Sequence, residues 1–188
     1  MQHKPKRARA IALPHSEVRA RATEYLDFLA AWVSKPRQTA SVVPSSRYLA
    51  RLMVRDIDPA DGRVMELGGG TGVFTRAILE TGLSADKLEV VEINPAFARG
   101  LRRHFPGVSI LETPAQIVST VAAGQPGYYL VIISGLPLRA IYRHIHVDIL
   151  SEAFPMLRPG GGVLQFHYSM RRPVSREVLD ALEVAVTR

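Results

Sequence analysis

The sequence predicts an α/β protein whose open, mostly parallel sheet is covered by helices on both faces. Two observations indicate this fold class. Runs that are apolar along their whole length, such as residues 129–134, alternate with segments of helical length, which is the pattern of strands buried on both faces. The first such run leads directly into Gly68-Gly-Gly-Thr-Gly72, and a turn at this place in an open sheet commonly binds a ligand.

The predicted elements alternate along the chain. Strands are expected at residues 63–67, 87–93, 108–111, 129–134 and 163–168, and helices at residues 47–55, 72–81, 95–105, 116–122, 146–157 and 176–186. Asn94 is predicted to cap the helix that starts with Pro95, because its side chain can accept hydrogen bonds from first-turn amides. The run Arg158-Pro-Gly-Gly-Gly162 is predicted to end a helix before the last strand.

Two segments precede these elements. Residues 1–15 contain four Lys and Arg residues without a regular period, which predicts a basic arm. Apolar residues then recur at helical spacing from Val18 to Val33, with Arg19 and Arg21 at the margins of the apolar face. Such a helix suits a membrane interface, and it also suits packing against its own domain. The expected parts are an arm at 1–15, amphipathic helices forming a lid toward substrate and membrane at 16–56, and a core at 57–188.

The charge balance favours an anionic partner. The chain carries 24 Lys and Arg residues against 17 Asp and Glu residues, a formal net charge of +7, which favours nucleic acid, anionic lipid or an acidic small molecule. The chain has no cysteine, so disulfide and thiolate chemistry are excluded. No apolar run approaches the roughly 18 residues of a spanning helix, and the N-terminus lacks the apolar stretch of a signal peptide. We therefore expect an intracellular protein that crosses no bilayer.

The glycine-rich turn implies a ligand that lies close to the backbone. A dinucleotide fingerprint, G-x-G-x-x-G, would need a third glycine at position 73, where the chain has Val73. The run Glu66-Leu-Gly-Gly-Gly-Thr-Gly72 instead resembles motif I, E/D-x-G-x-G-x-G, of the class I S-adenosylmethionine (SAM)-dependent methyltransferases. The resemblance implies a Rossmann-like sandwich in which this turn lies against the methionine and ribose part of SAM. The residues so implicated are Glu66, Gly68, Gly69, Gly70 and Gly72.

Two further positions extend the resemblance. Glu92 ends the second predicted strand twenty positions after Gly72, where the family carries an acidic residue that accepts hydrogen bonds from both ribose hydroxyls. Ile93 follows it and is assigned to the same site. After the third strand the family often has an acidic residue near the adenine amino group, but here Pro114 stands at about that place. The candidates for the adenine side are therefore Glu112, Thr113, Pro114 and Ala115.

The turn after the fourth strand indicates the methyl acceptor. It reads Ser134-Gly-Leu-Pro137, at the place where enzymes that methylate amino nitrogens carry an N/D-P-P-Y or N-L-P-Y turn. Its carbonyls and first side chain can accept hydrogen bonds from an attacking amine, so Ser134 and Leu136 are catalytic candidates. Ser134 is also assigned to the cofactor site. Leu138 replaces the aromatic residue that would stack on a flipped base, which disfavours methylation of nucleic acid.

The wider pattern resembles the bacterial phospholipid N-methyltransferases over most of residues 25–185. It rests on residues 28–36, 42–51, 134–137 and 157–161. The resemblance implies a monomer, peripherally bound to the inner face of the cytoplasmic membrane, that converts phosphatidylethanolamine to phosphatidylcholine through mono- and dimethyl intermediates. S-adenosylhomocysteine is the implied second product, and no metal is expected. The chain departs from the family by ending before two further strands and by an unusually basic and aromatic segment at 139–146.

The same resemblance implicates residues near both ends of the chain. Ser46 is assigned to the cofactor site. Tyr25 and Tyr168, with Tyr142, offer aromatic faces that suit a quaternary ammonium product. His167 can accept a proton, although a histidine near a strand end is more often structural.

Two alternatives stay open. An RNA or DNA adenine N-methyltransferase agrees with the positive charge and with the turn at residues 135–137, and disagrees with Leu138. A binding module without turnover agrees with the cofactor motifs, because these motifs report binding alone. The main prediction expects a phospholipid substrate and an anionic membrane surface as partners, and no nucleic acid.

Overall fold

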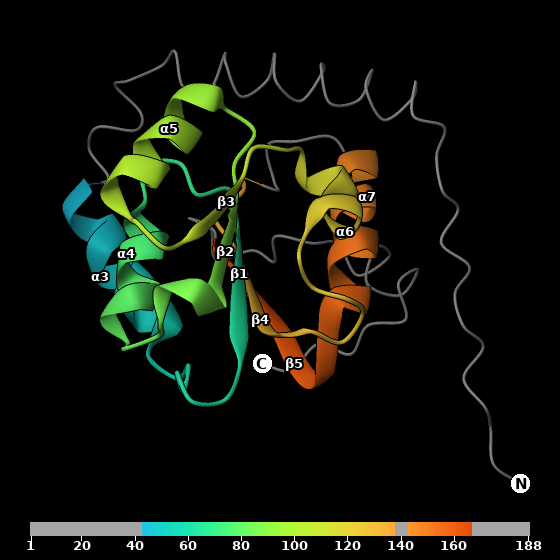
Figure 1. Cartoon of the computed structure of the whole chain (residues 1–188), viewed down its shortest axis with the longest axis horizontal. Helices are drawn as coiled ribbons and strands as arrows, with labels where there is room; N and C mark the ends of the chain where they lie inside the picture. Colours follow the sequence, from blue (N-terminus) through green and yellow to red (C-terminus); the bar gives the residue numbers. More distant parts are fainter. Residues whose placement is uncertain (1–42, 138–142, 167–188) are drawn as a thin grey trace, which may run out of the picture.

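Five parallel strands form the centre of the molecule, in the order β3-β2-β1-β4-β5 (Figure 1). The computed structural model describes residues 43–137 and 143–166. The strands are β1 Arg63–Leu67, β2 Leu88–Val91, β3 Ser109–Leu111, β4 Tyr129–Ser134 and β5 Leu157–Gln165. Helices α3, α4 and α5 cover one face, and α6 and α7 cover the other (Figure 1). The predicted α/β fold with a parallel sheet is therefore confirmed.

The helices follow the predicted alternation. Their bounds are α3 Val43–Val54, α4 Val73–Glu80, α5 Pro95–His104, α6 Val118–Val121 and α7 Arg143–Ala153, with short 3-10 turns η2 Ala85–Lys87, η3 Ala115–Ile117 and η5 Phe154–Met156. Asn94 caps α5 as predicted, because its side-chain oxygen accepts hydrogen bonds from the amides of Ala96 and Phe97. Within the described residues, no helix has both the length and the apolar character needed to span a bilayer.

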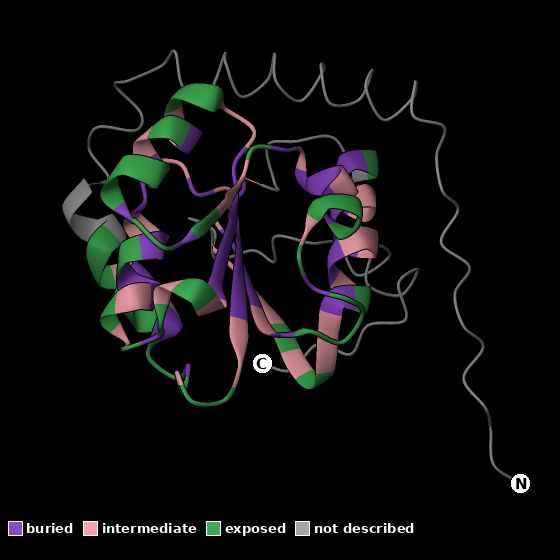
Figure 2. Cartoon of the chain, in the orientation of Figure 1, coloured by how far each residue is buried: buried purple, intermediate pink, exposed green. Residues whose placement is uncertain are grey.

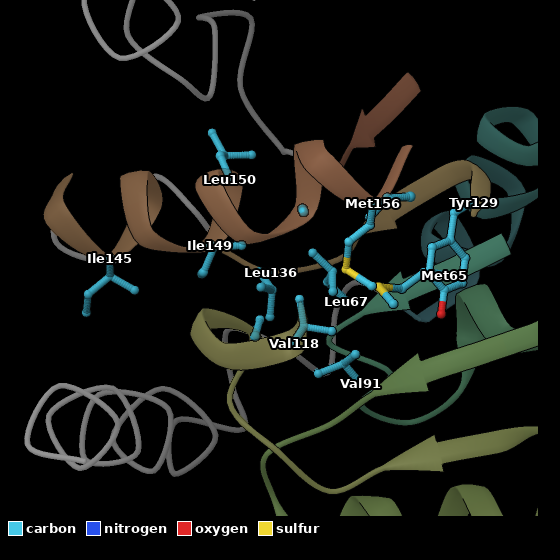
Figure 3. Close-up of a cluster of buried hydrophobic side chains, with 13 residues drawn as sticks. Met65, Leu67, Val91, Val118, Tyr129, Leu136, Ile145, Ile149, Leu150 and Met156 are labelled. Carbon is cyan, nitrogen blue, oxygen red and sulfur yellow. The ribbon is translucent and has the colours of Figure 1, made fainter. Parts of the chain in front are cut away.

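The strands are apolar because both faces of the sheet are covered. All four residues of β2 are buried, as are the last four of β1 (Figure 2). Side chains alternate between two cores: Val64 and Val90 pack toward α3, α4 and α5, whereas Met65 and Leu67 pack toward α6 and α7. Figure 3 shows the second core, in which Met65, Leu67 and Tyr129 of the sheet meet Ile149 and Met156.

The strand order places the ligand site. Strands β2 and β3 lie on one side of β1, and β4, the next strand in the chain, lies on the other side of β1. The loops after β1 and β4 therefore leave the sheet in opposite directions and leave a crevice at the carboxyl ends of these strands. The glycine turn, Gly68–Gly72, follows β1 at this point.

Several predicted boundaries were wrong. Among the strands, β2 is shorter than the predicted 87–93, and β5 spans Leu157–Gln165 rather than 163–168. Helix α3 begins at Val43 rather than near residue 47, since Pro44 is tolerated in a first turn. The segment predicted as a helix at 116–122 is η3 followed by the single turn α6. The predicted helix at 146–157 is α7 followed by η5, which ends at Met156.

The glycine run at 160–162 lies inside a strand and does not end a helix. Strand β5 begins at Leu157, and its pairing with β4 passes from Tyr129↔Leu157 to Val131↔Gly162. The extra residues of β5 form an irregularity, and there a side chain at Gly161 would lie 2.7 Å from the carbonyl oxygen of Leu130. A close backbone approach within the sheet therefore explains this glycine.

The N-terminal part of the described chain packs on the core. Ala50 and Val54 of α3 are buried among the side chains of α4 and the sheet. Helix α3, which lies near the end of the predicted segment 16–56, is thus part of a helical layer of the sandwich. The basic arm, the helix predicted from Val18 to Val33 and the helix predicted at 176–186 lie outside the described residues.

Candidate functional site

The glycine turn is held against the neighbouring strand by its own backbone. The amides of Gly68 and Gly69 both donate to the carbonyl oxygen of Val91, at 2.8 and 3.2 Å, and the amide of Gly72 donates to Gly69 at 2.8 Å. Gly68, Gly70 and Gly72 have φ angles of +82°, +51° and +80°. These are left-handed conformations that glycine adopts without the steric cost of a side chain.

The glycines differ in what surrounds them. A Cβ atom would lie 2.5 Å from Leu136 at Gly68, 2.5 Å from Val90 at Gly69 and 2.5 Å from Phe105 at Gly72. At Gly70 no atom of the protein lies within 4 Å of that position. Internal packing therefore explains three of the glycines, and Gly70 presents its backbone to open space.

Glu92 lies beside this open part of the turn. Its carboxylate accepts a hydrogen bond from the amide of Gly70 at 2.7 Å and another from the amide of Asn94 at 2.7 Å. The side chain is buried, and burial raises the pKa of Glu92 against the opposing effect of the backbone amides. Each carboxylate oxygen has a second lone pair, so Glu92 can still accept hydrogen bonds from a pair of hydroxyls.

Glu66 lies on β1, two residues before the glycine turn. It is fully buried at the end of β1, where the hydroxyl of Thr75 in α4 donates to one carboxylate oxygen at 2.6 Å. The other oxygen has no hydrogen-bond partner among the described residues. Burial raises the pKa of Glu66 to about 8, and the nearby charge of Glu92 adds to the rise. Glu66 is thus a buried link between β1 and α4, with no exposed surface for a ligand.

A small hollow adjoins the turn. It holds about 210 Å³ of empty space and is lined by Gly68, Val91, Ile93, Thr113, Ala115 and Leu136. Five of these residues were predicted for the cofactor or the acceptor, and Val91 was missed because a buried strand residue carries no distinctive signal. Pro114 directly precedes η3 and does not line the hollow. Glu112 also lies elsewhere, since its carboxylate pairs with Arg102 at 2.9 Å.

These features fit the predicted cofactor. The hollow has mostly apolar walls, which suit the faces of a base, and Gly70 with Glu92 offers an open backbone beside a buried carboxylate. The turn also leads into α4, whose first-turn amides favour a negatively charged group. Gly68, Gly70, Glu92, Ile93, Thr113 and Ala115 would hold SAM.

The acceptor side lies at the ends of β4 and β5. Ser134 is 2% exposed, and its hydroxyl has no hydrogen-bond partner among the described residues. Gln165 is its register partner on β5, so their side chains lie on the same face of the sheet. The Gln165 amide donates to the carbonyl oxygens of Leu136 and Phe166, whereas its own oxygen is unpartnered within the described chain.

Two aromatic rings lie close to this turn. Phe74 of α4 and Phe166 after β5 contact edge to face, with ring centroids 5.3 Å apart. A Cβ atom at Gly135 would lie 3.5 Å from the Phe74 ring and 3.3 Å from the carbonyl oxygen of Gly68. Gln165 and Phe166 were not predicted, because their position beside Ser134 depends on the β4–β5 register. Phe74 was not predicted, because its approach to Gly135 depends on how α4 packs on the sheet.

Several predicted residues lie outside the described part of the chain. These are Tyr25, Tyr142, His167 and Tyr168. The backbone of Ser46 belongs to α3, but its side chain is likewise outside the description. Their assignments stay predictions.

The chain resembles known methyltransferases in structure. It aligns with a TehB-like SAM-dependent methyltransferase from Corynebacterium glutamicum at a TM-score of 0.61, with 11% identity over 82% of each chain. The chain has the class I methyltransferase fold. A phosphoethanolamine N-methyltransferase from Haemonchus contortus shares this methyltransferase fold at a TM-score of 0.56 and 16% identity, over 73% of this chain and 30% of that protein.

Sequence comparison identifies two methyltransferases that are similar to this chain. Over 146 residues the chain is 29% identical to an ornithine lipid N-methyltransferase of Singulisphaera acidiphila, covering 73% of this chain and 74% of the relative. It is also 30% identical over 77 residues to ribosomal RNA small subunit methyltransferase A of Chlorobium chlorochromatii, which covers 41% of this chain and 28% of that protein. No protein-family model matches. The first match confirms the predicted resemblance to a lipid N-methyltransferase of class I.

Proposed function

We propose that this methyltransferase transfers methyl groups from SAM to the amine of a membrane lipid headgroup. One observation carries the proposal: on adjacent strand ends, the hydroxyl of Ser134 and the side-chain oxygen of Gln165 have no hydrogen-bond partner among the residues that the structure describes. Buried polar atoms are normally hydrogen-bonded, so two buried oxygens without a partner in the described chain, at the carboxyl ends of β4 and β5, favour a ligand that brings N–H donors. An amine brings such donors, whereas a carbon acceptor does not.

The residues at this site can orient an amine without a strong base. SAM, when bound, supplies an electrophilic methyl group on a sulfonium, and S-adenosylhomocysteine is the product. Ser134 and Gln165 accept hydrogen bonds from the nitrogen, so its lone pair can face the methyl group. If the amine titrates like lysine, its deprotonation at pH 7 costs roughly 4–5 kcal/mol. Apolar neighbours such as Leu136, Phe74 and Phe166 favour the neutral form by desolvation, and water takes the proton.

Phosphatidylethanolamine and its mono- and dimethyl derivatives are the proposed acceptors, with phosphatidylcholine as the final product. The resemblance of residues 134–137 and 157–161 to the phospholipid N-methyltransferases supports this choice. The Phe74–Phe166 pair also supports it, since aromatic faces suit an ammonium that has lost its N–H groups. The enzyme then works while peripherally bound to the inner face of the cytoplasmic membrane, as a monomer.

An ornithine lipid is the second candidate acceptor. The relative with the longest match is named for that substrate, and an ornithine headgroup also presents an amine. An adenine in RNA is the third, because the shorter match is to a ribosomal RNA methyltransferase. The two lipid candidates differ in the headgroup, whereas the third requires a different class of partner.

A parallel assay tests these alternatives. The full chain is given SAM with a labelled methyl group, together with phosphatidylethanolamine vesicles, ornithine lipid vesicles, ribosomal RNA or soluble phosphoethanolamine. Label in phosphatidylethanolamine, with mono-, di- and trimethyl products resolved by chromatography, is the expected result. Label only in ornithine lipid would mean that the ornithine headgroup, and not phosphatidylethanolamine, is the acceptor. Label only in RNA would overturn the proposal. Glu92→Ala serves as the control that carries the same acceptor site but a weakened cofactor site.

A further inference from the structure

We infer that the outer face of α3 and the groove between α3 and α4 form the surface by which the protein lies on an anionic lipid bilayer. The inference rests on the proposed lipid substrate. The outer face of α3 carries Arg47, Tyr48, Arg51 and Leu52, and Arg55 follows directly after the helix; all five are exposed. Ala50 and Val54, on the inner face, are buried against the core. The helix therefore packs on the sandwich by one face and presents the other outward (Figure 2).

The outer face carries two apolar side chains that the described fold leaves uncovered. Tyr48 is 70% exposed, the highest value of any large hydrophobic residue in the described ranges, and Leu52 is 43% exposed. They are four residues apart, so they lie one above the other on the helix surface. A tyrosine and a leucine in this arrangement suit insertion at the boundary between lipid headgroups and acyl chains.

The arginines form a stripe beside these apolar residues. Arg47, Arg51 and Arg55 recur at intervals of four, and α3 contains no acidic residue. At about 100° per residue the three arginines fan over roughly 80° of the helix surface, and Tyr48 and Leu52 fill the next 60° or so. Charged and apolar stripes side by side are the pattern of a helix lying in a membrane interface.

A groove continues the basic stripe onto α4. A hollow with about 280 Å³ of empty space lies between the helices, lined by Arg47, Arg51, Val73, Arg76, Ala77 and Glu80. Glu80 pairs with Arg51 at 2.9 Å, and Asp56 pairs with Arg55 at 3.3 Å. Four arginines thus meet two carboxylates, which leaves two positive charges in excess on this surface. Guanidinium groups around a hollow suit the phosphate oxygens of an anionic lipid.

The groove also lies close to the cofactor turn. Val73 is both a lining residue of the hollow and the first residue of α4, directly after Gly72. In Figure 1, α3 lies beside α4 on the same face of the sheet. A bilayer held by this surface would therefore lie near the end of the sheet at which the acceptor is methylated.

Vesicle flotation tests the inference on the full chain. Vesicles of phosphatidylcholine alone are compared with vesicles that also contain phosphatidylglycerol, in the absence of SAM. The protein is expected to float with the anionic vesicles and to be released by salt. Tyr48→Ser with Leu52→Ser should weaken binding at least tenfold, and Arg47→Gln should weaken it about fivefold. Val121→Ser, a similarly exposed residue on the opposite helical layer, is the matched control and should float like the unchanged protein.

Further measurements separate this inference from the proposed function. Turnover on a short-chain lipid dispersed as monomers should be unchanged in the α3 variants, because they do not touch the acceptor site. Loss of all lipid methylation with normal flotation would remove the proposed function and leave the inference intact. Normal flotation of the α3 variants would overturn the inference. A lowered Tm in the double variant would also overturn it, because it would mean that this face of α3 is packed against the protein itself. RNA binding is measured on the same variants. If the α3 variants lost binding to RNA while their binding to vesicles stayed unchanged, the inference would also be overturned.

Discussion

The carboxylate of Glu92 and the backbone amide of Gly70 are joined by a hydrogen bond of 2.7 Å. This bond links the end of β2 to the open side of the glycine turn after β1. A second bond, from the amide of Asn94 to the other carboxylate oxygen, fixes the side chain from the start of α5. The acidic residue that the sequence assigns to the cofactor is therefore also a structural anchor of both loops.

Glu92→Ala should weaken SAM binding more than tenfold, because charge-assisted hydrogen bonds contribute about 1.5–3 kcal/mol. Glu92→Gln should lose less, since its amide oxygen still accepts one hydrogen bond. Isothermal titration calorimetry measures both affinities. Asp86→Ala is the control, because Asp86 lies in the turn before β2, at the amino end of that strand, and should leave the affinity unchanged. Equal affinity of the Glu92→Ala variant and the unchanged protein would contradict the assignment.

Gly70→Ala and Gly72→Ala should separate cofactor binding from stability. At Gly72 an added methyl group meets the Phe105 ring in a left-handed backbone, which should cost about 2–5 kcal/mol of unfolding free energy. At Gly70 the methyl group meets no protein atom, so only the backbone cost of about 1–2 kcal/mol applies. Urea denaturation measures the stabilities and calorimetry measures the SAM affinities.

The Gly70→Ala variant should nevertheless bind SAM at least tenfold more weakly, because its methyl group occupies the open space beside Glu92. The Gly72→Ala variant should bind with an affinity closer to normal under conditions in which it is folded. The reverse order of the two affinities would mean that the open side of the turn is not the cofactor side.

The sequence predicted the sheet better than its surroundings. Continuous apolar runs mark strands buried on both faces, so β1 and β4 were predicted with their observed bounds. The glycine run at 160–162 was interpreted as a helix stop, because in a sequence the same residues mark a turn or a close approach of two strands. The approach of Gly161 to Leu130 depends on a register that no local pattern encodes.

The cofactor side of the site was also more predictable than the acceptor side. Gly70 and Glu92 belong to a motif with fixed spacing on consecutive elements, and the structure brings them into contact. Ser134 and Gln165 are 31 positions apart and meet only through the pairing of β4 with β5. The one available signal for Gln165 was that it is a polar residue within the strand predicted at 163–168.

Ser134→Ala should lower activity without lowering stability. The Ser134 hydroxyl is buried and unpartnered within the described chain, so its removal should leave the unfolding free energy unchanged or raise it by about 1 kcal/mol. Turnover with the amine acceptor should fall about tenfold or more, since an oriented acceptor for the attacking nitrogen is lost. Ser119→Ala is the matched control: its hydroxyl donates to Glu152, so it should lose some stability and keep its turnover. A Ser134→Ala variant with normal turnover would remove this residue from the acceptor site.

Burial of Glu66 should make the protein less stable as the pH rises. The pKa of Glu66 is raised from 4.5 to about 8, so between these values the folded state keeps a proton that the unfolded chain has released. The unfolded state then binds fewer protons, and the unfolding free energy falls with pH by about 1.4 kcal/mol per unit across this window. Below pH 4.5 and above pH 8, Glu66 contributes no further slope.

Glu66→Gln isolates this contribution, because glutamine keeps the shape of the side chain and an oxygen for the Thr75 hydroxyl but does not titrate. Urea denaturation at several pH values from 5 to 8 gives the difference in unfolding free energy between the variant and the unchanged protein. That difference should shift steadily in favour of the variant as the pH rises, because only the unchanged protein must take up a proton at this site in order to fold, and this uptake costs more free energy at each higher pH. A difference that stays constant across the window would show that the Glu66 carboxylate is solvated or paired in the folded protein, and that the buried link between β1 and α4 is wrong.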